Sequence, residues 1–338
     1  MNSIKEFKGI KKVAKKNIEK YGELSEEEIE KEIHAYRKEK MKRSLVPQKI
    51  LIKLKKTKAK KIFIQYPEGL TLKIVDIAKK LEKEGFEVLV CVEPCYGSCD
   101  LKDHKAKLMG CDTILHIGHS DFGLESEIPV IYWEYEIDVD PIPTLEKEFH
   151  KLKPYKKIGL VTSVQFVKAM NEVKEYLEKN GKEVFVHKTL KYPGQVLGCC
   201  VYSAEAIEDK VDAFVYVGAG KFHPLGVAIK VDKLVFSLDL EKNEIISLEK
   251  EKMKYLKKKA WHDSQLDDAK TVGILVSWKK GQNRVDEARK LKENLEKKGK
   301  EVTILVFDRI TKEKLEGLKF DVLVNMVCPR MDDEIYSL

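Results

Sequence analysis

Seven cysteines are the residues of this 338-residue chain best suited to chemistry, and three of them occupy comparable places. Cys99, Cys199 and Cys328 each lie in a turn-like segment that follows an apolar run typical of a β-strand. Thiolates are ligands for metal ions and iron–sulfur clusters. Three similar segments that each supply one thiolate are therefore a way to hold one metal cluster at a common centre.

The other four cysteines are weaker candidates. Cys91 is predicted to lie within an apolar strand and Cys111 to begin one, where buried inert thiols are usual. The sequence favours neither a ligand role nor a structural role for Cys95, which is expected in a loop. Cys200 adjoins Cys199, and two adjacent thiols do not easily reach one cluster. Because unpaired cysteine is often buried, spacing alone leaves a three-cysteine cluster and three unrelated buried cysteines as equal alternatives.

An internal repeat supports the idea of a common centre. Three segments read Leu-Glu-Lys-x-Gly-x-Glu-Val, namely Leu81–Val88, Leu177–Val184 and Leu295–Val302. Each is typical of a helix end, a glycine C-cap and the start of a strand. A repeat of roughly a hundred residues is the size of a small domain and too long for a solenoid unit.

Strand patterns that alternate with helical patterns predict βαβ units. We expect an α/β protein of three homologous domains, each with a parallel four-stranded sheet, arranged around a central iron–sulfur site. The expected divisions are a charged helical N-terminal extension (1–57) and domains over 58–154, 155–268 and 269–338, the last short at its C-terminus. Ligands of parallel sheets bind beyond the carboxyl ends of the strands, so the functional residues are expected at that edge of each domain.

The composition predicts a cytoplasmic protein that is not bound to a membrane. No apolar run approaches the roughly 20 residues of a membrane span, and the N-terminus lacks the apolar core of a signal peptide. An odd number of cysteines in a long, Lys-rich chain disfavours a disulfide framework. Charged residues make up 36% of the chain, a balance that resembles hyperthermophile usage.

The net charge of +8 raises the question of a nucleic-acid partner. About half of that charge lies in residues 1–45, where thirteen Lys or Arg residues face nine Glu residues. The two signs alternate there as on a solvated helix face. Aromatic and basic residues do not interleave in a way that would give a stacking platform for bases. We therefore predict no nucleic-acid partner, while a basic surface for a large, partly acidic macromolecule stays open.

Six motifs together resemble one enzyme family. They are Gln65-Tyr-Pro-Glu-Gly-Leu70, Tyr96-Gly-Ser-Cys99, His116-Ile-Gly-His-Ser120, Gly194-Gln-Val-Leu-Gly-Cys199, Gly220-Lys-Phe-His-Pro-Leu-Gly226 and Cys328-Pro-Arg330. In this order they are similar to the archaeal 2-(3-amino-3-carboxypropyl)histidine synthases of diphthamide biosynthesis. The resemblance implies a homodimer with a [4Fe–4S] cluster held by Cys99, Cys199 and Cys328, one cysteine per domain. It also implies S-adenosylmethionine as co-substrate, a histidine of elongation factor 2 as acceptor, and an electron donor.

The chemistry implied by the resemblance is a radical transfer. Three thiolates on a four-iron cluster leave one iron open, as a catalytic metal site requires. A sulfonium docked there could be cleaved by one electron, in this family on the side of sulfur that releases a 3-amino-3-carboxypropyl radical. That radical would add to an imidazole carbon of the acceptor histidine. The protein would orient the sulfonium and exclude water and oxygen.

Six further residues on strand-end segments are candidates for binding the co-substrate: Glu68, His119, Gln165, Gly220, His223 and Gln282. Gln165 and Gln282 follow the first strands of the second and third repeats, where amide donors could hold the methionyl carboxylate. Glu68 is equally suited to binding the amino group and to favouring the start of the following helix. Neutral histidines on strand-end loops, as expected for His119 and His223, more often only satisfy hydrogen bonds.

Two departures from the family pattern and two alternative functions remain. The chain ends ten residues after Cys328, whereas the family continues with another strand-like segment, and the charged N-terminal extension exceeds what the family core needs. The closest enzyme alternative is quinolinate synthase, which also builds three α/β domains around a three-cysteine [4Fe–4S] cluster. The non-enzymatic alternative is an electron-transfer or partner subunit, which the presence of all three cysteines disfavours.

Overall fold

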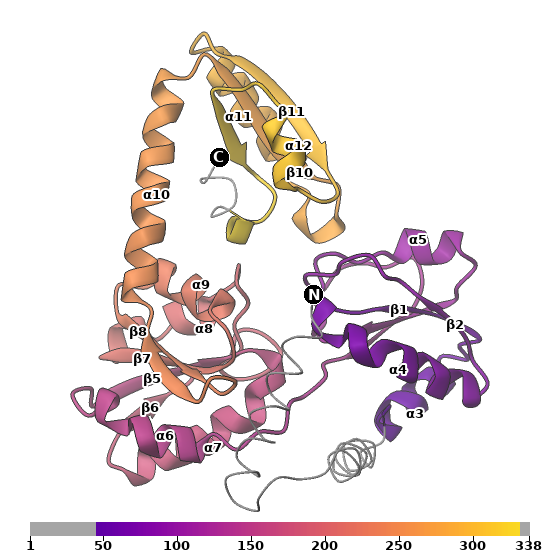
Figure 1. Ribbon diagram of the computed structural model, residues 1–338, viewed down its shortest axis with the longest axis vertical. Coiled ribbons are helices and arrows are strands. Elements are labelled where there is room, and N and C mark those ends of the chain that lie inside the picture. Colours follow the sequence, from indigo (N-terminus) through magenta and orange to yellow (C-terminus); the bar gives the residue numbers. More distant parts are fainter. Residues whose placement is uncertain (1–44, 332–338) are drawn as a thin grey trace, which may run out of the picture.

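Three separate β-sheets with their helices make up the part of the chain that the computed structural model describes, residues 45–331. Figure 1 shows them in chain order, from violet through magenta and orange to yellow. The helix α10 (Glu249–Asp268) leads from the second sheet to the third (Figure 1). The predicted α/β architecture is confirmed. Of the predicted N-terminal extension, residues 1–44 lie outside the described part of the chain.

Domain 1 contains a four-stranded, fully parallel sheet in the order β2-β1-β3-β4. Its strands are β1 (Lys61–Gln65), β2 (Glu87–Val90), β3 (Thr113–Ile117) and β4 (Val130–Trp133). Its helices are α3 (Gln48–Lys56), the 3₁₀ turn η1 (Glu68–Leu70), α4 (Thr71–Lys83) and α5 (Asp103–Leu108). On α4, Ile74, Ile77 and Leu81 recur at helical spacing and pack with Leu54 of α3 in one core cluster. The end of the N-terminal extension is therefore part of the core of domain 1.

Domain 2 contains a five-stranded sheet in the order β6-β5-β7-β8-β9. Its strands are β5 (Lys157–Thr162), β6 (Glu183–Phe185), β7 (Ala213–Gly218), β8 (Leu234–Asp239) and β9 (Glu244–Ser247). Its helices are α6 (Ile142–Glu148), η2 (Phe149–Leu152), η3 (Val164–Phe166), α7 (Val167–Lys179), α8 (Tyr202–Glu205), η4 (Glu208–Lys210) and α9 (Phe222–Lys230). The four parallel strands match the prediction. The fifth, β9, was not predicted and runs antiparallel to β8 after a turn in which Asn243 has φ +57°.

Domain 3 contains a three-stranded parallel sheet in the order β11-β10-β12, one strand fewer than the predicted four. Its strands are β10 (Thr271–Ser277), β11 (Glu301–Phe307) and β12 (Val322–Asn325). Its helices are η5 (Lys280–Gln282), α11 (Val285–Glu296), α12 (Lys312–Glu316) and η6 (Pro329–Met331). The described residues of this domain therefore do not form the predicted fourth strand.

The repeated sequence segment has the same structure in every domain. Its glycine ends the helix in the left-handed conformation, with φ of +94° at Gly85, +78° at Gly181 and +82° at Gly299. The glutamate two residues later begins the second strand, and its backbone N–H donates to the carbonyl just before the first strand at 2.8–3.0 Å. The predicted sequence of helix end, glycine cap and strand start is therefore confirmed.

An aspartate just before the third strand clamps the start of the first strand in all three domains. Oδ2 of Asp112, Asp212 and Asp321 each accepts hydrogen bonds from two consecutive backbone N–H groups. The donor–acceptor distances lie between 2.7 and 3.1 Å. These hydrogen bonds satisfy backbone donors at the amino-terminal edge of each sheet, which lies at the other end of the strands from the predicted site.

The linking helix α10 is strongly charged, and Tyr255 is its one buried residue. His262 of α10 contacts the backbone carbonyl of Leu323 in β12 at 2.8 Å, which ties the helix to domain 3. Within residues 45–331, no helix is both long enough and apolar enough to cross a membrane.

Candidate metal centre

The predicted ligands and most of their neighbours lie beyond the carboxyl ends of the strands, as expected for parallel sheets. In domain 1 the chain passes from β2 to Cys99 and from β3 to His119. In domain 2 the segment after β6 carries Cys199. In domain 3 the segment after β10 carries Gln282, and Cys328 follows β12.

The three predicted cysteine ligands approach one another. Burial raises the pKa of the Cys199 thiol, and the nearby thiols of Cys328 and Cys99 raise it further, to about 11. The Cys199 side chain still reaches solvent, whereas Cys99 and Cys328 are half-buried. Cys99 and Cys328, from two other domains, therefore lie near enough to Cys199 to influence its ionisation.

The segment after β10 docks domain 3 onto the Cys99 segment of domain 1. The backbone N–H of Gly281 donates to the carbonyl of Cys99 at 2.9 Å. Nε2 of Gln282 donates to Sγ of Cys99 at 3.3 Å. A Cβ atom on Gly281 would lie 2.6 Å from Cα of Cys99, so glycine is required at this close approach.

Charged side chains at the same junction form buried ion pairs. Oδ2 of Asp100 lies 2.9 Å from Nζ of Lys102 and 3.1 Å from Nζ of Lys279, and all three side chains are at most 9% exposed. Lys280 pairs with Asp103 at 2.6 Å. Burial favours a higher pKa for the Asp103 carboxyl, but the hydrogen bond from Lys280 and the other nearby donors leave that pKa below its usual value. Domain 3 is thus joined to domain 1 by charge pairing as well as by backbone contact.

The junction between domains 1 and 2 uses side-chain amides. Nε2 of Gln165 donates to the backbone carbonyl of Gly118. Nε2 of Gln195, which is almost fully buried, donates to Oγ of Ser120 at 2.8 Å. The amide of Gln165, predicted to hold the carboxylate of the co-substrate, is therefore engaged with the backbone of domain 1.

The turn before Cys199 is packed tightly by residues from domains 2 and 3. A Cβ atom on Gly198 would lie 2.4 Å from the Phe222 ring and 3.0 Å from the Arg330 side chain. The guanidinium of Arg330 lies over the Phe222 ring, 5.0 Å from its centroid. Glycine at position 198 is what allows these two side chains to cover the segment that carries Cys199.

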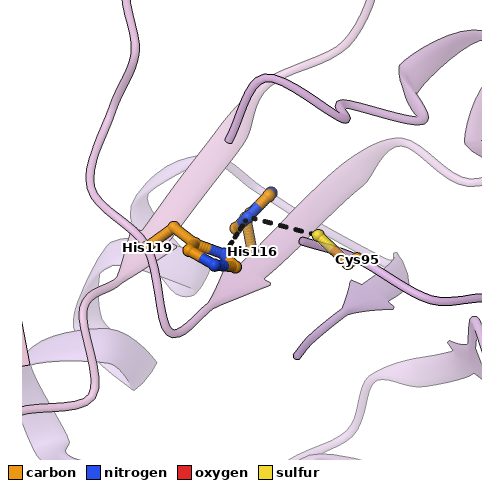
Figure 2. A group of neighbouring side chains, drawn as sticks. All are labelled: Cys95, His116 and His119. Carbon is orange, nitrogen blue, oxygen red and sulfur yellow. Dashed lines mark hydrogen bonds between the residues drawn. The ribbon is translucent and has the colours of Figure 1, made fainter. Parts of the chain in front are cut away.

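A second group of potential ligands lies inside domain 1 (Figure 2). Nε2 of His116 lies 3.0 Å from Nδ1 of His119 and 3.8 Å from Sγ of Cys95. Burial lowers the pKa of His119 to about 4, with a further contribution from His223. Burial likewise lowers the pKa of His116 well below its usual value. The structure therefore places Cys95, for which the sequence indicated no role, beside two histidines.

The other residues predicted to bind the co-substrate lie in different environments. His223 was predicted on a strand-end loop, but it lies in the first turn of α9, where its ring stacks on Tyr216 at a centroid distance of 6.1 Å. Burial, followed by the charge of Arg330, lowers the pKa of His223 to about 4. Gly220 has φ +69° and donates its N–H to Asp239 at 3.3 Å. The side chain of Glu68 is exposed at the start of η1.

Several residues of the centre were not predicted from the sequence. The ion-paired residues Asp100, Asp103, Lys279 and Lys280 flank predicted site residues in the chain, but only the fold brings them together. The one signal in the sequence was the cluster of charges and glycine in the segment Ser277-Trp-Lys-Lys-Gly-Gln282.

The donor set at the junction of the three domains fits an iron–sulfur cluster. Cysteine thiolates are the usual ligands of such clusters, and three of them leave one of four irons without a protein ligand. The amide of Gln282 already donates to the Cys99 sulfur, a contact of the kind that tunes iron–sulfur sites.

The fold and the site define a class: a three-domain α/β protein whose strand-end segments converge on a thiol-lined centre. A family model described as "Putative diphthamide synthesis protein" matches residues 66–334. The chain belongs to this family of diphthamide synthesis proteins. The match favours diphthamide synthesis over the quinolinate-synthase alternative.

Individual relatives agree with this assignment. The 2-(3-amino-3-carboxypropyl)histidine synthase of Pyrococcus horikoshii is 35% identical over 292 residues, which cover 85% of this chain and 84% of that protein. The enzyme of the same name from Methanocaldococcus jannaschii is 30% identical over 300 residues, covering 81% and 79%. The crystal structure of Dph2 from Pyrococcus horikoshii with a 4Fe–4S cluster matches with a TM-score of 0.78 at 34% identity and covers 84% of each chain.

Proposed function

We propose that this protein transfers the 3-amino-3-carboxypropyl group of S-adenosylmethionine to a histidine of elongation factor 2, the first step of diphthamide biosynthesis. The observation that carries the proposal is that the cysteine-bearing segments of three domains meet: Gly281 of domain 3 contacts Cys99 of domain 1, and Arg330 of domain 3 covers Gly198 beside Cys199 of domain 2. Similarity to the Pyrococcus horikoshii synthase over most of both chains supports the reaction. In this proposal the enzyme acts in the cytoplasm as a homodimer and receives electrons from a separate donor.

Cys99, Cys199 and Cys328 are the proposed ligands of a [4Fe–4S] cluster. When bound and reduced, the cluster supplies the single electron that cleaves a carbon–sulfur bond of S-adenosylmethionine. Gln282 donates an N–H to the Cys99 sulfur, which stabilises negative charge on that sulfur. This contact gives Gln282 a role beside the cluster, in addition to the contact with the co-substrate predicted from the sequence.

The surroundings of the centre suit a cationic sulfonium. His223 has a pKa of about 4, so its ring is uncharged near neutral pH and does not repel a cation. The exposed carboxylate of Glu68 remains a candidate partner for the amino group of the co-substrate. Gly220 carries no side chain and leaves open space beside its Cα atom, which suits close approach of a ligand to the backbone.

The domain junctions suit a radical reaction because they keep water from part of the surroundings of the centre, while the Cys199 side chain reaches solvent. The Asp100, Lys102 and Lys279 side chains are almost fully buried where domain 3 meets domain 1. The amides of Gln165 and Gln195 close the contact between domains 2 and 1. Exclusion of water protects a reactive intermediate from side reactions.

A mass spectrum of archaeal elongation factor 2 tests the reaction. The factor would be incubated anaerobically with this protein, dithionite and S-adenosylmethionine. We expect one 3-amino-3-carboxypropyl addition, on a single histidine, which is lost when dithionite is left out. No addition by protein that carries a reducible cluster would contradict the proposal and would favour a partner subunit that needs a second chain.

A further inference from the structure

The Cys95, His116 and His119 group is distinct from the three converging cysteines. All three residues belong to domain 1: Cys95 follows β2, His116 lies in β3, and His119 lies in the segment after β3. Figure 2 shows the two imidazole rings and the thiol turned toward one another. Cys95 is 2% exposed and His116 is fully buried. A thiol and two imidazoles are the side chains that Zn²⁺ prefers.

The ligand atoms are spaced nearly as a metal ion requires. Zn–S bonds of about 2.3 Å and Zn–N bonds of about 2.0–2.1 Å place tetrahedral ligand atoms roughly 3.3–3.6 Å apart. The observed separations are 3.8 Å from Cys95 Sγ to His116 Nε2 and 3.0 Å from there to His119 Nδ1. All three atoms lie within 4.8 Å of one another. The two observed separations therefore differ from the tetrahedral values by a few tenths of an ångström, and metal binding would also draw Cys95 Sγ and His119 Nδ1 together to about 3.6 Å.

The surroundings of the group also suit a metal-bound thiolate. Nε2 of the fully buried Gln65 donates to Sγ of Cys95 at 3.1 Å. The orientation of this amide is fixed, because its Oε1 accepts from the backbone N–H of Lys102 at 3.2 Å. Nδ1 of His116 has no hydrogen-bond partner within residues 45–331, so the polar contacts of its ring are made through Nε2. Metal-bound sulfur commonly has such a second layer of donors.

We propose that Cys95, His116 and His119 bind one Zn²⁺ ion, with water as the fourth ligand. Binding releases the Cys95 thiol proton to solvent, and no oxidation or reduction is involved. The ion joins the segment that carries Cys99 to the segment that carries His119, and so it fixes one wall of the centre. The ion lies beside the proposed cluster, and its test does not depend on the transfer reaction.

Cobalt binding to a chain that cannot hold the cluster tests the site. The full-length Cys99→Ala, Cys199→Ala, Cys328→Ala variant would be prepared metal-free and titrated anaerobically with Co²⁺. We expect one Co²⁺ per chain, with a thiolate-to-cobalt charge-transfer band and tetrahedral d–d bands, displaced by Zn²⁺. Adding Cys95→Ser should remove the charge-transfer band. Adding His119→Ala should remove the tetrahedral pattern of the d–d bands. Adding Gln65→Ala should weaken Co²⁺ binding by about 10- to 100-fold.

The matched control is Cys111→Ser, because Cys111 is also a buried thiol of domain 1 but lies in a different cluster of side chains. This variant should keep both sets of bands. No charge-transfer band in a protein whose circular dichroism shows the native fold would overturn the proposal, as would a band that survives Cys95→Ser.

Zinc analysis of the cluster-loaded protein gives a second test that does not need the triple variant. After incubation with Zn²⁺ and desalting, we expect one zinc per chain in the wild type and in Cys111→Ser, and none in Cys95→Ser. Equal zinc contents in all three proteins would overturn the assignment.

Discussion

The two ends of the parallel strands in the three sheets differ in how closely the domains resemble one another. At the amino ends, Asp112, Asp212 and Asp321 make the same pair of hydrogen bonds in every domain. At the carboxyl ends, equivalent residues do different things: the amide of Gln165 donates to a backbone carbonyl, whereas that of Gln282 donates to the Cys99 sulfur. The shared end maintains the fold, and the diverged end builds a site to which each domain contributes differently.

The largest effect is expected where a carboxyl-end segment crosses between domains. Gly281→Ala would place a Cβ atom 2.6 Å from Cα and 2.7 Å from Cβ of Cys99, so domain 3 must move away. Because Cys328 moves with it, we expect loss of cluster iron and a fall in transfer rate of about 100-fold, as misplacement by an ångström can cause. Iron analysis measures the cluster content, and the elongation-factor assay measures the transfer rate.

Gly317→Ala is the matched control for this variant. A Cβ atom at Gly317 in the same domain meets nothing within 4 Å. Its iron content and activity should equal those of the wild type. If Gly281→Ala behaved in the same way, the close junction between domains 3 and 1 would not be needed for the site.

A large loss of stability is expected when the buried ion pairs at this junction are broken. Asp100→Ala leaves the buried ammonium groups of Lys102 and Lys279 without their shared carboxylate. We expect the free energy of unfolding to fall by about 3–5 kcal/mol, measured by denaturant titration. Asp263→Ala, which breaks an exposed pair with Lys259, should cost about 0–1 kcal/mol. If Asp100→Ala and Asp263→Ala lowered the free energy of unfolding equally, the junction would be open to water.

The reduction potential of the cluster should distinguish the two equivalent glutamines, Gln165 and Gln282. Gln282→Leu removes an N–H donor from the Cys99 sulfur, so the reduced cluster is less stabilised and its reduction potential should fall. Gln165→Leu removes a contact to Gly118 and should cost about 1 kcal/mol in stability without shifting the potential. Redox titration followed by electron paramagnetic resonance measures the potentials. A shift in both variants or in neither would remove the distinction between these residues.

The smallest effect is expected at the amino ends. Hydrogen bonds from the backbone of Lys157 and Lys156 lower the pKa of Asp212. A carboxyl whose pKa is lower in the folded state stabilises the fold above its unfolded pKa and loses that effect as the pH falls through the folded pKa. Asp212→Asn should therefore lower the melting temperature slightly at neutral pH and not in strong acid, with cluster content unchanged. A lower iron content in this variant would contradict the division between the two ends.

Much of the fold could be predicted because its periodic signals are local. The glycine caps at Gly85, Gly181 and Gly299 and the strands around them follow from hydrophobic periodicity and from the left-handed conformation that glycine allows. The β9 hairpin was missed because its turn, Leu240-Glu-Lys-Asn243, lacks the glycine pattern of common hairpins. His223 was predicted in a strand-end loop, but it lies in the first turn of α9, where the following Pro224 is tolerated.

The candidate site could be predicted only in part, because its contacts are long-range. The three cysteines could be chosen from their turn-like settings and from the family resemblance. The pairing of Lys280 with Asp103 joins residues 177 positions apart and depends on how two domains dock, which no local pattern encodes. The grouping of Cys95 with His116 and His119 likewise arises from neighbouring strands of one sheet.

The most direct test of the central claim, that three carboxyl-end segments jointly hold one cluster, is metal analysis of cysteine variants. Iron, sulfide and brown absorbance would be measured anaerobically for Cys99→Ala, Cys199→Ala, Cys328→Ala and their combination, with Cys111→Ala and Cys200→Ala as matched controls. We predict that each of the three single variants and the triple variant loses the intact cluster, whereas both controls keep it. A cluster retained in the triple variant would contradict the claim.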